Sequence, residues 1–222
     1  MRHITIKSTL RNTQNNILFE GSFPTLKDGL EAAISDNVAL DNADLSNQNL
    51  TNANLDEYSF KSVTFEGSNL SGTNLSACNL SGSNLKNTSL YNTCFAESNL
   101  QYSDFTGAFF GGTDIAAANI MGCVFSTMTS FDLDFILTRN MDDVTFLNPD
   151  GKHCNITNPP IVVKNILPKP LIIMDRTVKY GHDILPTPLL QSGKLAKLIQ
   201  ELRHSQKTMN TTHDAIASAQ QL

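Results

Sequence analysis

Between residues 38 and 125 a large apolar residue stands at every fifth position of the chain. The series consists of Leu40, Leu45, Leu50, Leu55, Phe60, Phe65, Leu70, Leu75, Leu80, Leu85, Leu90, Phe95, Leu100, Phe105, Phe110, Ile115, Ile120 and Phe125. A period of five differs from the period of about 3.6 of a helix and of about 2 of a simple strand. It therefore indicates a repeat architecture, in which a short unit is stacked on copies of itself.

The other positions of each five-residue unit also have a fixed character. The residue two places before the large one is usually small, the residue directly before it is mostly Asn or Asp, and the two that follow are polar or Gly. This pattern predicts that large and small side chains point inward while the chain turns a corner after each unit. The Asn or Asp suits such a turn, because its side chain can bond nearby backbone groups. Four corners would close a coil of about twenty residues, and stacked coils would lie about 4.8 Å apart.

Several units resemble the pentapeptide-repeat consensus A-(D/N)-L-x-x. They include Ala-Asp-Leu-Ser-Asn at residues 43–47, Ala-Asn-Leu-Asp-Glu at 53–57 and Ser-Asn-Leu-Lys-Asn at 83–87. The resemblance covers roughly 100 of the 222 residues. It implies an all-β solenoid, a right-handed quadrilateral β-helix. It does not assign a function, because one fold can carry many different functions.

The flanking sequences divide the chain into four parts. Residues 1–37 are expected to form a β-hairpin and a short helix that cap the first coil, since a β-stack exposes unpaired strand edges at its ends. The repeat body spans residues 38–150 and becomes degenerate after about residue 126. Residues 151–204 predict strands and an amphipathic helix, which make a small C-terminal α+β module. Residues 205–222 form a polar tail.

Local signals mark the boundaries of these parts. In the cap, Asn15-Asn16 predicts a turn, Thr25 is the expected N-cap of the helix and Asn37 its stop signal. The repeat register breaks near Ser130, because Phe135 fits the original series whereas Met141 and Phe146 fit a series shifted by one residue. The sequence Asn-Pro-Asp-Gly at 148–151 predicts a turn that ends the body. In the C-terminal module, residues 161–163, 171–174 and 177–180 read as strands.

Charge is distributed unevenly between the parts. Residues 36–135 contain eleven acidic and two basic residues, whereas residues 152–207 contain nine basic and three acidic residues. Sorting the body by the twenty-residue period yields an acidic face with Asp56, Glu57, Glu97 and Asp114. The next face, centred on Leu50, Leu70, Leu90 and Phe110, has no charged residue and carries Tyr91 and Phe109. Both faces are candidate partner surfaces, and we favour the uncharged face because aromatic residues are enriched at interfaces.

The resemblance also raises DNA mimicry as an alternative. Some pentapeptide-repeat proteins that confer fluoroquinolone resistance bind DNA gyrase by resembling duplex DNA. Five coils would span about 24 Å, a length over which B-DNA carries about 14 charges. The body has a net charge of −9 spread over four faces, so its charge density per face is well below that of a duplex. A solvated surface that keeps the protein soluble is the competing interpretation of this acidity.

The sequence shows no catalytic, cofactor-binding or metal-binding constellation. The five His residues are scattered outside the repeat body, and the four Cys residues lack metal-type spacing. His153-Cys154 could be half of a metal site or a dyad, but adjacent residues of a strand point to opposite faces. Gly111-Gly112 is not followed by the Lys-Ser/Thr of a phosphate-binding loop. We therefore expect a protein that is not an enzyme and binds no cofactor, metal or nucleic acid; a site in the C-terminal module is a remote alternative.

The expected function is protein–protein interaction, in which the rigid β-helix presents one face as a scaffold. The alternatives are a DNA gyrase or topoisomerase modulator and a bacterial effector that acts on host proteins. The chain has no apolar run of about eighteen residues and no secretory signal near its start, so we expect a cytoplasmic protein, with delivery into a host left open. We also expect a homodimer through the apolar stripe of the C-terminal helix, although this stripe could instead serve only to cap the stack. The stripe consists of Leu195, Leu198, Ile199 and Leu202.

Overall fold

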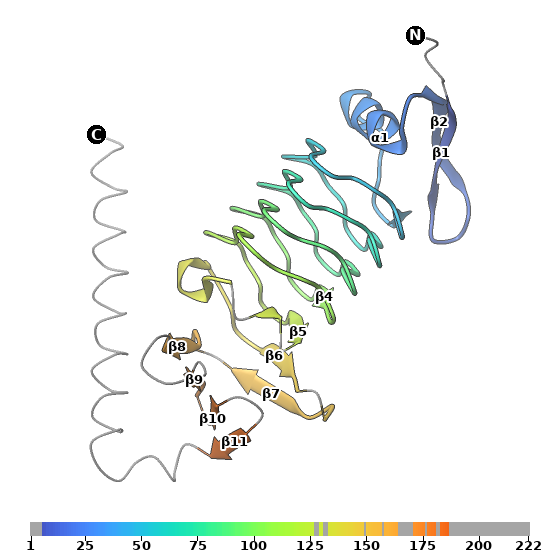
Figure 1. Cartoon of the computed structure of the whole chain (residues 1–222). Coiled ribbons are helices and arrows are strands. Elements are labelled where there is room, and N and C mark those ends of the chain that lie inside the picture. The colour runs from blue at the N-terminus through green and yellow to red at the C-terminus, as the bar shows by residue number, and fades with distance from the viewer. Residues whose placement is uncertain are drawn as a thin grey trace, which may run out of the picture. The chain divides into compact units, whose positions relative to one another are not determined.

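The structure is a computed structural model. It describes residues 6–126, 129–130, 133–148, 150–156, 158–163, 171–175, 177–180 and 183–186 (Figure 1). The chain divides into two compact units, the first made of Met1–Asp134 and Thr138–Asn155 and the second of Phe135–Leu137 and Ile156–Leu222. The predicted C-terminal helix, with its proposed dimer stripe, and the polar tail lie outside the described residues.

The first unit begins with the hairpin and helix expected from the sequence. Strands β1 (Ile6–Asn12) and β2 (Ile17–Phe23) pair in antiparallel fashion, and helix α1 spans Leu26–Ser35. The Thr25 hydroxyl caps the helix by accepting a hydrogen bond from the Asp28 backbone N–H, at 3.2 Å. At the other end Asn37 has a φ of 54°, and the Val38 N–H donates to the Ala33 carbonyl at 2.9 Å. This is a Schellman motif, which explains why the helix ends where the stop signal predicts.

Parallel β-bridges connect residues that lie twenty positions apart along the repeat body. Asp44 pairs with Thr64 and Thr64 with Asn84, and similar columns start at Asn49, Asn54 and Ser59. The few strands with more than one residue are also short; they are β3 (Ala43–Asp44), β4 (Asp104–Phe105) and β5 (Val124–Ser126). Parallel pairing at a constant twenty-residue step is the pattern of a β-helix, and it confirms the predicted length of the coil.

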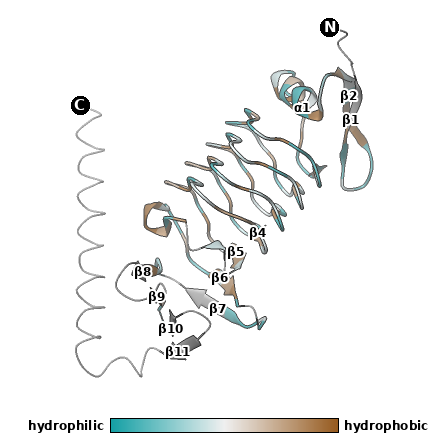
Figure 2. Cartoon of the chain, in the orientation of Figure 1, coloured by the Kyte–Doolittle hydropathy of each residue, from teal (hydrophilic) through white to brown (hydrophobic). Residues whose placement is uncertain are grey.

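The large residues of the series fill the interior of the stack. All eighteen have at most 6% of their surface exposed, and Figure 2 shows hydrophobic and hydrophilic residues alternating along the coils. The small polar residues beside them are also buried, and their hydroxyl groups have acceptors. Ser68, for example, donates to the Leu45 carbonyl at 2.6 Å, and Thr73 donates to the Leu50 carbonyl at 2.7 Å. These two hydroxyls bind one coil to the previous one, whereas Thr88 and Ser98 donate within their own coil, to the carbonyls of Leu85 and Phe95.

The corners of the coil share one backbone feature. The second residue after each large one has a positive φ at every corner from Asn42 to Gly122. In the corner after Leu50, the Ala53 N–H donates to the Leu50 carbonyl at 3.0 Å, which together with the positive φ of Asn52 is the signature of a type II turn. The predicted role of the Asn or Asp before the large residue is confirmed, since Asp44 Oδ1 accepts from the Ser46 N–H at 3.0 Å.

The predicted one-residue shift of register is present near the end of the body. Asn119 pairs with Asn140 and Val124 with Thr145, so the step is twenty-one residues here instead of twenty. Strand β6 (Val144–Leu147) extends the ladder, and the turn at 148–151 leads to β7 (His153–Ile156), which lies next to β6 in the same sheet. The turn therefore does not end the sheet, which continues through β7 beyond the expected limit of the body at residue 150.

The second unit contains a four-stranded antiparallel sheet. Its strands are β8 (Ile161–Val163), β9 (Leu171–Ile173), β10 (Thr177–Tyr180) and β11 (Asp183–Pro186), in the order β11-β10-β9-β8. The sequence predicts the first three strands but not β11. A short 3-10 helix, η2 (Phe135–Leu137), also belongs to this unit. Within the described parts of the chain, no helix has the length and apolar character needed to cross a bilayer.

Candidate interaction surface and polar cavity

The acidic face is sparsely charged in the structure. Glu57, Glu97 and Asp114 are exposed and Asp56 is half-buried. Glu57 and Glu97 occupy the same corner two coils apart, which separates them by about 9.6 Å along the stack. The Asp114 carboxylate also has a structural role, because its Oδ1 accepts from the Ala116 N–H at 2.9 Å. The four residues thus share one side of the stack without forming a dense cluster of charge.

The uncharged face presents its two aromatic side chains to solvent. Tyr91 is 47% exposed and Phe109 is 50% exposed, whereas the adjacent Phe110 points inward and is 6% exposed. Gly111 lies directly beside the Tyr91 ring, one coil further along. A Cβ atom on Gly111 would lie 2.6 Å from Tyr91 Cδ1, so only glycine leaves room for the ring in this position. Tyr91 and Phe109 therefore form an exposed aromatic surface whose backbone is held by the β-helix.

A third exposed aromatic residue, Tyr102, is not predicted by the sequence pattern. It is 65% exposed and lies at a corner with a φ of 60°. A Cβ atom on Gly122 would lie 2.4 Å from Tyr102 Cδ1, so the arrangement of Tyr91 and Gly111 is repeated here. Tyr102 belongs to a different corner of the coil from Tyr91. The signal that could have found it is an aromatic residue at a corner with glycine twenty positions later.

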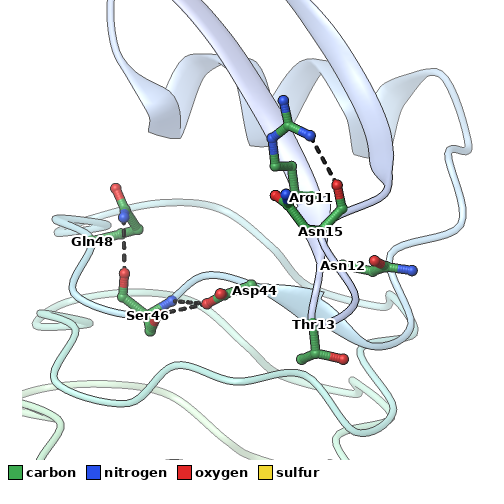
Figure 3. A pocket seen from close by; sticks show the side chains of 7 residues that line it. All are labelled: Arg11, Asn12, Thr13, Asn15, Asp44, Ser46 and Gln48. Atoms are coloured by element: carbon green, nitrogen blue, oxygen red, sulfur yellow. Dashed lines mark hydrogen bonds between the residues drawn. The ribbon is translucent and has the colours of Figure 1, made fainter.

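A polar cavity lies between the cap and the first coil. Its volume is about 220 Å³, and Figure 3 shows the side chains that line it. They are Arg11, Asn12, Thr13 and Asn15 from the hairpin and Asp44, Ser46 and Gln48 from the coil. Antiparallel pairing of β1 with β3 places Arg11 opposite Asp44. The sequence gives no direct signal for this site, because its two groups of residues are about thirty positions apart and meet only through that pairing.

The two buried thiols of the body are poorly suited to act as nucleophiles. Burial raises the pKa of the Cys78 thiol to about 11, and burial also raises the pKa of Cys123. Both thiols donate to backbone carbonyls of the previous coil, Cys78 to Leu55 and Cys123 to Leu100. A protonated, buried thiol is a packing group and not a nucleophile. Among the residues that the structure describes, no three His, Cys, Asp or Glu side chains are grouped as metal ligands would be.

Comparisons with known proteins agree with this geometry. A model described as "Pentapeptide repeat region" matches residues 33–108, and a model described as "Pentapeptide repeats (8 copies)" matches residues 93–126. No curated protein matches the chain.

Among solved structures, the chain is similar to a pentapeptide repeat protein, Rfr23, from the cyanobacterium Cyanothece 51142. The two are 18% identical with a TM-score of 0.38, over 46% of this chain and 80% of that one. The protein alr5209 from Nostoc is 21% identical with a TM-score of 0.31, over 46% and 84% of the two chains. QnrB1, a plasmid-mediated fluoroquinolone resistance protein, is 20% identical with a TM-score of 0.20, over 46% and 57%. The two family models, which the twenty-residue ladder independently supports, place residues 33–126 of this chain in the pentapeptide-repeat family.

Proposed function

We propose that this chain is a non-enzymatic scaffold, in which a right-handed quadrilateral β-helix presents its uncharged face to a protein partner. The observation that carries the proposal is the exposure of Tyr91 and Phe109, each about half exposed, on a face without charged residues. Large aromatic side chains that enter a pocket of a partner contribute much of the binding energy of protein interfaces. A face without charge also avoids burying an unpaired ionic group when a partner covers it.

The fixed backbone under this face favours binding. The Phe109 N–H donates to the Thr88 carbonyl at 2.9 Å, and the Gly72 N–H donates to the Tyr91 carbonyl at 2.8 Å. These bonds hold the two aromatic residues in the ladder before any partner arrives. Less conformational freedom is then lost on binding than with a mobile loop, and this preorganisation increases affinity.

The test is capture of partners from a lysate of the source cells, followed by identification by mass spectrometry. We expect the double variant Tyr91→Ala/Phe109→Ala to lose the partner that the unchanged chain captures. The matched control is Tyr102→Ala, which removes a still more exposed aromatic ring at another corner and should leave capture intact. A second variant replaces Asp56, Glu57, Glu97 and Asp114 by Asn or Gln. Loss of capture by this charge variant, with Tyr91→Ala/Phe109→Ala harmless, would contradict the proposal.

The alternative of a DNA gyrase or topoisomerase modulator would use the acidic face. A DNA duplex carries one charge per about 1.7 Å of its axis, whereas Glu57 and Glu97 are about 9.6 Å apart along the stack. We therefore place this alternative second. It is tested directly by adding the purified chain to a gyrase supercoiling assay, in which inhibition that the charge variant abolishes would support DNA mimicry. A bacterial effector would instead capture its partner from a host lysate.

A further inference from the structure

The polar cavity between the cap and the first coil contains two opposite charges that do not pair with each other. Arg11 and Asp44 are directly opposite each other in the antiparallel pairing of β1 with β3. Residues in such positions have Cβ atoms about 5 Å apart. In the part of the chain that the structure describes, neither residue forms an ion pair with the other or with a neighbour. Such a pair of opposed charges would ordinarily be expected to meet.

Both charged groups are instead bonded to residues that follow their own strand. Arg11 Nη1 donates to the Asn15 carbonyl at 2.8 Å, and Asp44 Oδ1 accepts from the backbone N–H and the hydroxyl of Ser46. Figure 3 shows the guanidinium directed toward the hairpin turn and the carboxylate directed toward Ser46. The cavity therefore has a cation on the side of the hairpin and an anion on the side of the coil.

Each charged group keeps hydrogen-bonding capacity that these contacts do not use. A guanidinium has five N–H donors, and the bond to the Asn15 carbonyl engages one of them. The bonds from Ser46 both go to Oδ1 of Asp44, which leaves Oδ2 able to accept from a ligand. The other lining side chains carry amide or hydroxyl groups, so the lining is mostly polar and suits a polar ligand.

We propose that this cavity binds a small zwitterion of amino-acid size. The carboxylate of the ligand binds the free N–H groups of Arg11, a pairing that planar guanidinium groups favour, and its ammonium group donates to Asp44 Oδ2. A simple anion would be attracted by Arg11 but repelled by Asp44, and a simple cation would meet the reverse situation. A zwitterion satisfies both groups without adding net charge to the site.

The size of the cavity agrees with this class of ligand. Its volume of about 220 Å³ is many times the roughly 10–15 Å³ that a cavity needs to hold one water molecule. A free amino acid with a small side chain fits such a space.

The experiment is a titration of the full, ¹⁵N-labelled chain with glycine, followed through the backbone amide signals in NMR spectra. We expect saturable shifts confined to residues 11–16 and 42–48, with a Kd of about 1 mM. N-acetylglycine lacks the ammonium group and glycinamide lacks the carboxylate. Each should bind at least about tenfold more weakly than glycine, because each leaves one of the two charged side chains without its partner.

Two variants test the assigned residues. Asp44→Asn removes the charge but retains Oδ1, and Asn49 shows that asparagine makes the same turn contact, because its Oδ1 accepts from Thr51. Arg11→Gln removes the cation. Both should raise the Kd for glycine at least about tenfold. The matched control is Asp114→Asn, which changes the same position of a repeat unit far from the cavity and should leave the Kd unchanged.

Three results would overturn the proposal: no saturable shift below about 50 mM glycine, equal binding of either blocked analogue, or equal loss of binding in Asp114→Asn. If Arg11→Gln disturbs the hairpin, its amide spectrum shows this, and Asp44→Asn then decides alone. The measurement uses the purified chain without a protein partner. Its outcome is therefore separate from that of the proposed scaffold function.

Discussion

The side chain of Glu31 in α1 accepts a hydrogen bond from the backbone N–H of Asn54 in the first coil, at 2.9 Å. One coil further along, the corresponding N–H of Asn74 donates to the Ala53 carbonyl, also at 2.9 Å. The first coil has no coil before it, so the carboxylate takes the place of the missing carbonyl. The helix therefore supplies an acceptor that the ladder itself lacks at this end.

Removing this acceptor should weaken the N-terminal end of the stack. We expect Glu31→Ala to lower the free energy of unfolding by about 1 kcal/mol, because Asn54 loses a charged acceptor. Glu31→Gln keeps an acceptor oxygen and should cost less. Urea denaturation measures both. Lys27→Ala on the same helix is the control and should change stability by no more than about 0.5 kcal/mol; a Glu31→Ala variant as stable as this control would contradict the assigned contact.

Two corner glycines separate backbone strain from side-chain crowding. Gly72 and Gly82 have φ values of 70° and 71°, so alanine at either position is strained by about 1–2 kcal/mol. A Cβ atom on Gly72 would lie 2.2 Å from Asn52 Oδ1, whereas on Gly82 it would lie 3.4 Å from Ser62 Oγ. We expect Gly72→Ala to destabilise the chain more than Gly82→Ala in thermal denaturation. Equal losses would mean that the Asn52 side chain moves aside without cost.

Substitution of two neighbouring residues should cost very different amounts of stability, according to the direction in which each side chain points. Leu85 is fully buried, and Leu85→Ala should cost about 2–5 kcal/mol because it leaves a cavity in the stack. Lys86 forms an ion pair with Asp104 at 3.0 Å, with both side chains partly exposed, and Lys86→Ala should cost about 0.5 kcal/mol. The comparison of melting temperatures checks both values. Equal melting temperatures would refute the inward direction of Leu85.

The buried thiol of Cys78 should make stability depend on alkaline pH. Its pKa is raised to about 11, chiefly because burial disfavours the thiolate, whereas a thiol in an unfolded chain has a pKa of about 8.5. The unfolded chain therefore releases its proton first. The contribution of Cys78 to the free energy of unfolding is therefore fully present below about pH 8.5, and it declines as the pH rises toward 11.

The measurement is the free energy of unfolding between about pH 7 and pH 10 for the unchanged chain and for Cys78→Ser. Serine is a suitable replacement, because Ser68 occupies the same kind of position and donates to the Leu45 carbonyl. We expect the free energy of unfolding of the unchanged chain to fall relative to that of Cys78→Ser as the pH rises. A difference that stays constant across this range would show that the thiol does not ionise more easily in the unfolded chain.

The interior of the β-helix could be predicted from the sequence because its period leaves few choices. Leu and Phe at every fifth position fit neither a helix nor a flat strand, and a turn after each unit is what remains. The corner geometry was harder to predict, because Glu57, Ala77 and Tyr102 share a positive φ with glycine and asparagine. Residue type alone is therefore a poor predictor of the positive φ at the corners.

Other features depend on contacts between distant parts of the chain. The cavity requires the pairing of β1 with β3, and its register is set by packing that local patterns do not reveal. Strand β11 was missed since Asp183 and Pro186 are residues that strands usually exclude. The dimer stripe at residues 195–202 lies outside the described chain and stays a prediction.

The antiparallel pairing of β1 with β3 has a consequence for assembly between molecules. A stack of parallel coils exposes at its end a template to which the coils of another copy can add, building a fibril as in cross-β structures. At the N-terminal end, β1 pairs with β3 in antiparallel fashion, so the first residue of the ladder that starts at Asp44 already has a partner. The side chain of Glu31 likewise accepts from the backbone N–H of Asn54, the first residue of another ladder. A second molecule would have to displace both before its own coil could continue the ladder, so these contacts protect the chain against end-to-end polymerisation.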